Sequence, residues 1–302
     1  MRIYLFTGDE IGAGAFALLA VGASSIAVLA AWLLSSRAER LGLVSRRRID
    51  RFGAGAVPLT GGFGLLLGAG AALLSLRADV PHGLLIAGSG FFLVGLADDR
   101  HSLRPRLKLA LQVAVAVLTL LSMGAGLAQT GLSVLLLVGC VNACNYLDNM
   151  DGLLPGVSWV MAAALAAFGM RTGLQVGAGA ALLMWALPGI FLLNLPPARI
   201  YLGDSGSHLV GAMLAFDALG LLFEPAPRLE RVLPLAILFA VPLVDTATVS
   251  VSRLRRGRPL FRGGLDHLSH RIVRAGWPVP GAVALLMLGS AVCGAASLLL
   301  LS

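Results

Sequence analysis

Ten long apolar stretches dominate this chain, and they constrain its fold more than any other feature. A helix needs about 20 apolar residues to cross the hydrocarbon core of a bilayer. Hydrophobic residues make up 58% of the 302 residues, charged residues only 13%, and the mean hydropathy is +0.88. A soluble protein has too little interior to bury so much apolar surface, so lipid must surround much of the chain. We therefore expect an all-α integral membrane protein with about ten transmembrane helices. The stretches cover residues 11–34, 57–76, 83–97, 107–127, 130–147, 153–170, 174–193, 207–223, 231–251 and 279–301.

The same stretches exclude other architectures. They are continuous rather than alternating, and they are longer than the roughly 10-residue strands of membrane barrels. No repeat, linker or second domain is visible, so we expect residues 1–302 to form one polytopic domain. The N-terminus lacks the pattern of a cleaved signal peptide, so the first stretch is expected to remain as a helix. Cys140, Cys144 and Cys293 lie in apolar segments without metal-site spacing, which is typical of small apolar fillers.

The basic residues indicate the orientation of the chain. Cytoplasmic loops of membrane proteins carry an excess of Lys and Arg. With the N-terminus outside, eighteen of the 23 basic residues fall on inner loops and their flanks. We therefore expect both termini to face away from the cytoplasm, in the inner membrane of a bacterium. The net charge of +8 then reflects topology and a landing surface for anionic substrates, and it does not indicate nucleic-acid binding.

Three groups of acidic residues fall at the predicted cytoplasmic ends of helices. Asp98 and Asp99 form an adjacent pair. Asp148 and Asp151 lie three residues apart, and Asp204 lies in a Gly-Asp-Ser-Gly-Ser segment. Carboxylate and amide oxygens suit Mg²⁺, which takes one or two protein carboxylates and leaves room for substrate phosphate. The pattern predicts metal-assisted chemistry on a phosphorylated substrate at the inner face, and the alternative is that these acids only mark the water boundary. Three arginines suited to phosphate oxygens follow the first pair: Arg100, Arg104 and Arg106.

Residues 253–277 form the longest stretch without apolar character, and they carry His267 and His270 among several arginines. Histidine with arginine is typical of phosphate binding or proton transfer. A basic loop attracted to anionic headgroups is the alternative, and it explains the arginines but not the histidines. Asp245, inside an apolar stretch, is expected to make a polar contact between helices, whereas the sequence offers no account of Asp217.

Two glycine-containing segments allow more than one interpretation. Residues 203–207 open a predicted helix, where small residues let backbone N–H groups approach an anion or simply cap the helix. Gly61 and Gly62 permit a close approach of the backbone to a ligand, although tight helix packing is the commoner use of such residues.

Four motifs resemble those of the polyprenyl-phosphate N-acetylhexosamine-1-phosphate transferases, membrane enzymes of the glycosyltransferase family 4 type with about ten or eleven helices. They follow the order of the family and cover nearly the whole chain. The resemblance implies transfer of a sugar 1-phosphate, such as that of N-acetylglucosamine, from a UDP-sugar to undecaprenyl or another polyprenyl phosphate. UMP is released, and the lipid product initiates synthesis of a cell-envelope glycan. The motifs are Asp98-Asp99 to Gln112, Asn142 to Gly152, Asn194 to Ser207, and Pro242 to Arg271.

The resemblance also implies roles for individual residues. Asp204 matches the principal Mg²⁺ ligand and Asn145 a second ligand, with Mn²⁺ as a substitute ion. Asp98 and Asp99 match the pair that handles the lipid phosphate, in which Asp98 accepts the phosphate proton. Lys108 matches a position that supports this pair.

The donor substrate is matched by other positions. Asn194 and Tyr201 match residues that hold uracil, Tyr201 by stacking. Asp148 and Asp151 match the motif near the nucleotide and diphosphate. The loop positions that meet the diphosphate or the sugar are His267, His270 and Arg271.

The sequence departs from the family pattern in two places. The family loop reads His-x-His-His-Arg, or three adjacent histidines in the peptidoglycan branch, and Ser269 stands at the middle histidine. This argues against the alternative function, phospho-N-acetylmuramoyl-pentapeptide transfer. Gly53 stands where a histidine is expected before Pro58. A transporter is a remote alternative, because the acids lie at one face and no inverted repeat is visible. A homodimer is compatible with the resemblance.

Overall fold

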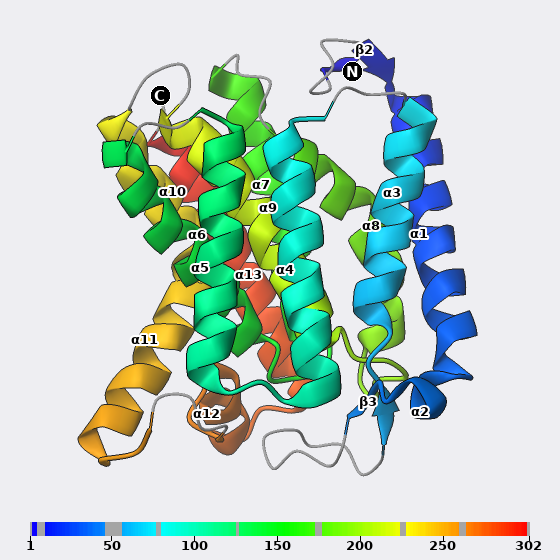
Figure 1. The fold of residues 1–302 in the computed structure, drawn as a ribbon, viewed down its shortest axis with the longest axis vertical. Helices are drawn as coiled ribbons and strands as arrows, with labels where there is room; N and C mark the ends of the chain where they lie inside the picture. Colours follow the sequence, from blue (N-terminus) through cyan, green and yellow to red (C-terminus); the bar gives the residue numbers. More distant parts are fainter. Residues whose placement is uncertain are drawn as a thin grey trace.

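Helices form over all ten apolar stretches, as expected for an all-α protein. The computed structural model describes residues 2–4, 10–45, 56–76, 80–124, 127–172, 177–223, 228–259 and 264–300. The N- and C-termini lie at one end of the bundle, and α12 and the end of α11 lie at the other (Figure 1). The helices are α1 (Ala13–Ser35), α2 (Ala38–Leu41), α3 (Gly61–Leu76), α4 (His82–His101), α5 (Pro105–Ser122), α6 (Leu127–Leu147), α7 (Leu153–Thr172), α8 (Ala178–Asn194), α9 (Gly203–Phe223), the 3-10 helix η1 (Leu229–Arg231), α10 (Val232–Leu238), α11 (Ala240–Arg255), α12 (Leu268–Arg274) and α13 (Val279–Leu299).

Two very short strand pairs accompany the helices. β1 (Arg2–Tyr4) pairs antiparallel with β2 (Glu10–Gly12), and β3 (Val44–Ser45) pairs antiparallel with β4 (Val57–Pro58). The sequence predicts no strands; the first pair precedes α1, and the second lies between α2 and α3. The second pair also positions the chain before α9, because the carbonyl of Pro58 accepts a hydrogen bond of 2.8 Å from Tyr201 N–H.

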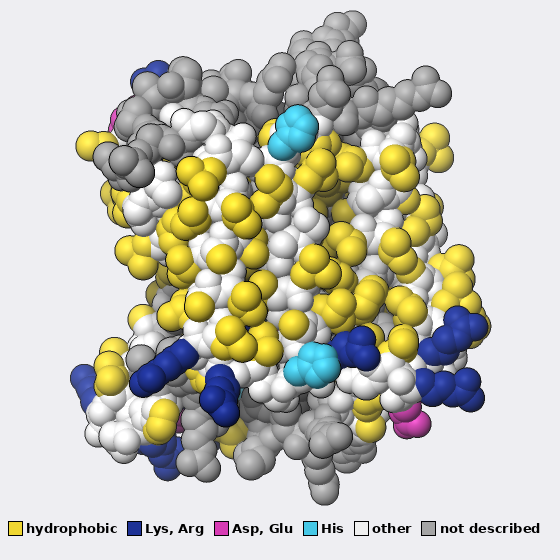
Figure 2. All heavy atoms as spheres, in the orientation of Figure 1, with side chains coloured by type: hydrophobic (Ala, Val, Ile, Leu, Met, Phe, Trp, Pro, Cys, Tyr) yellow, Lys and Arg dark blue, Asp and Glu magenta, His cyan; other side chains and the backbone are white. Residues whose placement is uncertain are grey.

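The described helices are those of a multi-pass membrane protein. Five of them are long and apolar enough to cross a membrane, in α1, α5, α6, α9 and α13. The bent pair formed by residues 229–238 and α11 counts as a sixth if it is one span. Apolar side chains form a broad band around the visible face, and most of the visible Lys and Arg side chains lie at the end opposite the termini (Figure 2).

Helix α9 lies at the centre of the bundle and is almost entirely buried. It packs against α3, α4, α6, α7 and α8, which is the environment expected for a helix that is apolar all round. Glycines permit the closest contacts. A Cβ atom on Gly95 of α4 would collide with the carbonyl oxygen of Asp204, and one on Gly62 of α3 would lie 2.5 Å from Gly206 N. Gly62 therefore packs against protein backbone, and together these glycines fix the first turn of α9.

The helix expected over residues 231–251 is broken. α10 ends at Leu238, α11 begins at Ala240, and the two are bent by 74°. Pro242 has no N–H to donate, and its ring interferes with the carbonyl four residues earlier, which belongs to Leu238. The proline therefore accounts for the position of the break. The prediction of one continuous helix over residues 231–251 was wrong on this point.

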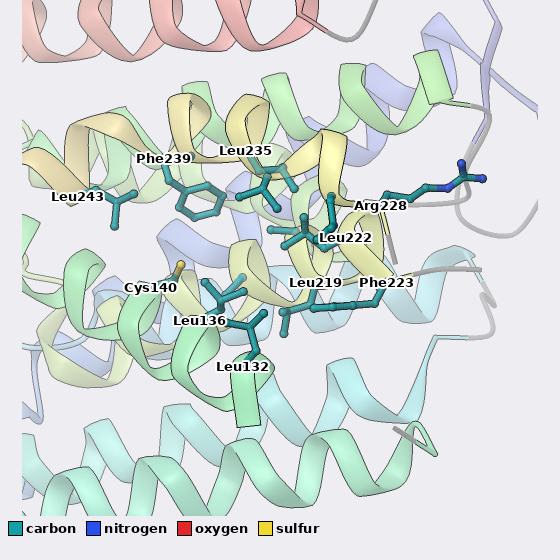
Figure 3. Close-up of a pocket in the computed structure, with 15 residues that line it drawn as sticks. Leu132, Leu136, Cys140, Leu219, Leu222, Phe223, Arg228, Leu235, Phe239 and Leu243 are labelled. Atoms are coloured by element: carbon teal, nitrogen blue, oxygen red, sulfur yellow. The ribbon is translucent and has the colours of Figure 1, made fainter. Parts of the chain in front are cut away.

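The bend opens an apolar groove in the half of the bundle near the termini. Its volume is about 220 Å³, and it lies between α6 and α9 on one side and η1, α10 and α11 on the other. Figure 3 shows Leu136, Leu222 and Phe239 facing the groove, while Arg228 extends away from its end.

Candidate active site

Lys108 brings two of the three acidic groups together. Its ammonium Nζ lies 2.9 Å from Asp98 Oδ2 and also binds Asp204 Oδ2. Asp98 belongs to the last turn of α4, Lys108 to the first turn of α5, and Asp204 to the first turn of α9. None of the three side chains is more than 16% exposed. Two carboxylates around one ammonium leave a net negative charge, so this cluster is suited to a further cation.

Asp99 has a different partner from its neighbour. Its two carboxylate oxygens accept hydrogen bonds from Asp204 N–H at 2.8 Å and Ser205 N–H at 2.9 Å. Asp99 therefore caps the first turn of α9, where the helix dipole favours negative charge. Gly203 makes the approach possible, because its φ is +73° and a Cβ atom there would lie 2.7 Å from Asp99 Oδ2. The cap fixes the backbone that carries Asp204.

Helix α6 supplies polar side chains beside the same turn. Asn145 Nδ2 donates a hydrogen bond of 2.9 Å to Ser207 Oγ. One turn earlier, Asn142 Nδ2 donates to Gln112 Oε1 at 2.8 Å, and Gln112 Nε2 lies 2.8 Å from His208 Nε2. This network joins α5, α6 and α9, and it gives His208, for which the sequence indicates no partner, a place in the support of the site.

The donor set at this end of the bundle fits Mg²⁺. Among the described residues, no group of three or more His, Cys, Asp or Glu side chains is arranged to hold a metal ion. Mg²⁺ requires fewer, because it is commonly held by one or two carboxylates and completed by water and phosphate oxygens. The carboxylates of Asp98 and Asp204 already converge on one cationic group, and the amide of Asn145 lies on the helix packed against α9.

The residues predicted to meet the nucleotide hold together the connection between α8 and α9. Asn194 is fully buried, and its side chain accepts from Gly152 N–H at 2.8 Å and donates to the Ile200 carbonyl at 2.7 Å. Asp151 Oδ2 accepts from Ala198 N–H at 3.0 Å. The contacts observed for these side chains are therefore structural, and a contact of Asn194 with uracil stays a prediction.

Tyr201 is also buried in this structure. Its ring belongs to a small apolar cluster with Leu43 and Leu59. The predicted stacking on uracil stays a prediction, and it requires a face of this ring that the cluster leaves accessible.

The histidine loop forms a second polar cluster. Asp245 Oδ2 lies 2.8 Å from His267 Nδ1, and Asp245 Oδ1 accepts a hydrogen bond of 2.6 Å from Leu268 N–H. The His267 ring lies 5.6 Å from the His270 ring and meets the Tyr146 ring edge-on at 6.1 Å, measured between centroids. The expected polar contact of Asp245 between elements is thus a contact with the start of α12.

Ser269 connects the histidine loop to the turn between α6 and α7. Its hydroxyl donates a hydrogen bond of 2.5 Å to Asn149 Oδ1, and both side chains are buried. Asn149 lies between Asp148 and Asp151, so the position at which the sequence departs from the family pattern is tied to the turn that carries these acids.

Arginines surround one carboxylate beside the same loop. Asp266 lies 3.6 Å from Arg253 Nε and 3.1 Å from Arg256 Nη1, and its backbone carbonyl accepts from Arg271 Nε at 3.1 Å. The Arg253 guanidinium also lies over the Tyr146 ring, 5.6 Å from its centroid. Two guanidinium groups at this carboxylate, with a third at the backbone carbonyl of the same residue, leave a positive surplus, which suits an anionic ligand. Arg262, another basic residue of this loop, lies outside the described residues.

The structure thus joins the predicted residues in two clusters linked through α6. Asp98, Lys108 and Asp204 meet directly, whereas His267 and His270 form the second cluster beside Tyr146, the chain neighbour of Asn145. Sequence analysis assigned no site role to a further group of residues. Four of them lie within the motifs, namely Asn149, Ser207, Asp245 and Asp266, and His208 is a polar side chain inside an apolar stretch.

Asp217 belongs to neither cluster. Its carboxylate is buried and accepts hydrogen bonds from Ala180 N–H at 2.6 Å and Gly179 N–H at 3.3 Å. It therefore caps the first turn of α8, which is the account that the sequence alone could not supply.

Comparisons with known proteins identify the family of this chain. Residues 82–221 match the family described as "Glycosyl transferase family 4". The chain is 30% identical over 285 residues to "Undecaprenyl-phosphate alpha-N-acetylglucosaminyl 1-phosphate transferase" of Yersinia pestis, covering 84% of this chain and 76% of that protein. It is 27% identical over 282 residues to the protein of the same name from Escherichia coli K12, covering 84% and 75%.

A third relative comes from Mycobacterium leprae. The chain is 31% identical over 333 residues to "Decaprenyl-phosphate N-acetylglucosaminephosphotransferase" of Mycobacterium leprae, covering 93% of this chain and 83% of that protein. The match therefore extends beyond the segment that holds Asp98 and Asp204. The chain belongs to glycosyl transferase family 4, within the polyprenyl-phosphate N-acetylhexosamine-1-phosphate transferases that its four motifs resemble.

Proposed function

We propose that the protein transfers N-acetylglucosamine 1-phosphate from UDP-N-acetylglucosamine to undecaprenyl phosphate or a related polyprenyl phosphate. The products are the polyprenyl-diphosphate sugar and UMP, and the lipid-linked sugar then enters cell-envelope glycan synthesis. The relatives described above carry names of this activity. Ser269, at the middle histidine position of the family loop, also disfavours the peptidoglycan branch.

One observation carries the proposal, namely the meeting of Asp98, Lys108 and Asp204 where α4, α5 and α9 come together. A soluble anionic nucleotide sugar and a lipid-anchored phosphate can meet only at the membrane surface. The cluster lies at the polar end of apolar helices, where both substrates have access. Exposed arginines next to it are suited to holding the lipid phosphate: Arg100, Arg104 and Arg106.

The reaction follows from the charges at this end of the bundle. An oxygen of the lipid phosphate attacks the phosphorus attached to the sugar, and the bond from that phosphorus to the bridging oxygen breaks, so UMP leaves with that oxygen. In this proposal Asp98 accepts the proton of the lipid phosphate. His267, His270 and Arg271 hold the diphosphate or the sugar.

We propose that Mg²⁺ completes the site, held by Asp204 with help from Asn145 and Asp98. When bound, the ion supplies neutralisation of the charge that develops on the diphosphate. When the ion is absent, the ammonium group of Lys108 offsets the repulsion between the carboxylates of Asp98 and Asp204. Mn²⁺ offers similar oxygen-seeking chemistry and is expected to substitute.

We further propose that all ten apolar stretches cross the inner membrane, with the site on the cytoplasmic face. The basic residues support this orientation, because most of those visible in Figure 2 lie at the end opposite the termini. The shorter apolar helices α3, α7 and α8 then pack inside the bundle as spans of reduced length.

The direct test is a UMP-release assay with the purified full-length protein, Mg²⁺, undecaprenyl phosphate and a panel of UDP-sugars. UDP-N-acetylglucosamine is expected to give the fastest release. If only UDP-N-acetylmuramoyl-pentapeptide supported UMP release, the protein would belong to the peptidoglycan branch instead. No release above background with any sugar would remove the transferase function.

The metal site has a separate test in the same assay. Asp204→Ala is expected to abolish turnover, because the principal metal ligand and one partner of Lys108 are lost together. Glu39→Ala, on the short helix α2, is the matched control, since that carboxylate is exposed and makes no contact with the site. Full Mg²⁺-dependent activity of Asp204→Ala would remove Asp204 from this role.

A further inference from the structure

We propose that Asp245 is a positioning residue of the transferase, which holds the imidazole of His267 so that its Nε2 nitrogen meets the donor substrate. The inference rests on the proposed function, because it requires phosphate or sugar groups beside α12. Asp245 is a buried carboxylate of α11, 22 residues before His267 in the chain. Neither the composition of the loop nor its spacing indicates this pairing.

Both carboxylate oxygens of Asp245 are used by the start of α12. Oδ2 lies 2.8 Å from His267 Nδ1, and Oδ1 accepts the 2.6 Å hydrogen bond from Leu268 N–H. An ionised carboxylate can only accept, so the Nδ1 nitrogen of His267 must carry a hydrogen. The contact therefore fixes the tautomer as well as the direction of the ring, and it leaves Nε2 for another partner.

Aromatic neighbours hold the ring on other sides. Tyr146 meets it edge-on, with interplanar angle 89°, and the His270 ring is tilted against it at 57°. Within the described part of the chain, no hydrogen bond engages His267 Nε2, and 6% of the side-chain surface stays exposed. The ring is thus fixed by protein at Nδ1, and none of the described hydrogen bonds occupies its Nε2.

The surroundings indicate which ligand Nε2 would meet. The Arg253 guanidinium lies over the Tyr146 ring, so an imidazole and a cation share one aromatic neighbour. Asn145, next to Tyr146 on α6, bonds Ser207 in α9, the helix whose first turn carries Asp204. The arginine beside His267 favours an anionic ligand, and the diphosphate of a nucleotide sugar is an extended anion that could reach from there toward the cation site at Asp204.

The principal test is Asp245→Asn in the full-length protein. The amide keeps the volume and can still accept from Leu268 N–H through its oxygen. Its NH₂ group then faces His267 Nδ1 and forces the opposite tautomer, with the hydrogen on Nε2. We expect kcat for UMP release to fall about 10–100-fold, the usual cost of losing a group that orients a functional histidine.

Asp217→Asn is the matched control. Asp217 is also a buried carboxylate that caps a helix start through two backbone N–H groups, but its described contacts involve α8 and no histidine. It should keep the kcat of the native enzyme. An equal fall in kcat for Asp217→Asn would show that the loss of any buried helix cap explains the result, and it would overturn the proposal.

A double-mutant cycle separates orientation from structural support. In the His267→Gln background, Asp245→Asn should lower kcat no further, because the ring that it orients is already gone. If Asp245→Asn lowered kcat by the same factor in both backgrounds, the proposal would be overturned. Asp245 would then act only by supporting α12, because that effect does not need the imidazole.

Histidine tautomers provide a readout that does not depend on turnover. Nitrogen NMR of the protein with ¹⁵N-labelled histidine can follow its five histidines, with His267 assigned by the His267→Gln variant. The native ring should carry its hydrogen on Nδ1 and the Asp245→Asn ring on Nε2. An unchanged tautomer would overturn the proposal, whereas a failure of every UDP-sugar to release UMP would overturn the proposed function instead.

Discussion

At the scale of single residues, buried and partly buried carboxylates in this protein are used to begin helices. Asp99 caps α9, Asp217 caps α8, and Asp245 binds the first N–H group of α12. The first N–H groups of a helix have no partner within the helix, and in lipid they find no water either. Each acid therefore satisfies donors that would otherwise be costly to bury, and it does so from a different element of the chain.

Replacing Asp217 tests this role directly. Asp217→Ala leaves the N–H groups of Gly179 and Ala180 without acceptors, so we expect it to cost about 1–2 kcal/mol of stability. The unfolding temperature in detergent should fall, while the kcat of the surviving enzyme stays the same. Asp217→Asn, which retains an acceptor oxygen, should be affected less. An unfolding temperature of Asp217→Ala equal to that of the native protein would refute the capping role.

The sequence identified some residues of the site but not their partners. Asp98 and Asp204 were recognisable because charge is rare in this chain and because both lie in motifs that resemble a family. The link of Ser269 to Asn149, 120 residues apart, and that of Asp217 to Ala180 could not be foreseen. Such contacts depend on which faces of distant helices meet, and no local pattern encodes that choice.

At the scale of elements, the close approach of α4 to α9 assembles the site. Gly95 allows it, because any side chain there would collide with the backbone of Asp204 and Ser205. The same contact lets Asp99 reach the first turn of α9 and brings Asp98 to the lysine that binds Asp204. Small residues commonly allow helices to pack this tightly within membranes.

Gly95→Ala should therefore separate α4 from α9 and remove most of the transferase activity. Overpacking of this kind costs about 1–3 kcal/mol, so the unfolding temperature should fall as well. Gly70→Ala on α3 is the control, because a Cβ atom there meets nothing within 4 Å and alanine is the better helix former. Full activity of Gly95→Ala would mean that the two helices can move apart without disturbing the site.

Helix positions were more predictable than helix shape. Apolar length alone located the helices, because hydrocarbon leaves the backbone few other ways to satisfy its hydrogen bonds. The 74° bend before α11 was not predicted, although Pro242 was visible in the sequence. Pro188 lies inside α8 without ending it, so a proline by itself does not reveal whether a helix will break.

At the scale of the whole molecule, the bundle has two chemically different ends. The termini lie at one end, and α12 and the end of α11 lie at the other (Figure 1). The histidine cluster forms at the start of α12. Substrates of opposite solubility can be joined only if the site opens to water and to lipid at once. The basic residues at that end favour the proposed orientation, with the opening on the cytoplasmic side.

Cysteine labelling in intact cells checks this orientation. A cysteine at Arg256 should be shielded from an impermeant external reagent, whereas one at Leu229, which is 79% exposed near the opposite end, should be labelled. The three native cysteines are first replaced by alanine to remove background. Labelling of the Arg256 position from outside would invert the proposed topology.

The separate contacts of Asp98 and Asp99 affect how mutational data on this protein should be interpreted. An alanine scan scored by turnover would count both positions as indispensable and group them as a single catalytic motif. Their environments differ: Asp98 binds the lysine of the proposed reaction centre, and Asp99 anchors a helix start. Loss of the first would leave a folded but inactive enzyme, whereas loss of the second would loosen the frame on which the chemistry depends.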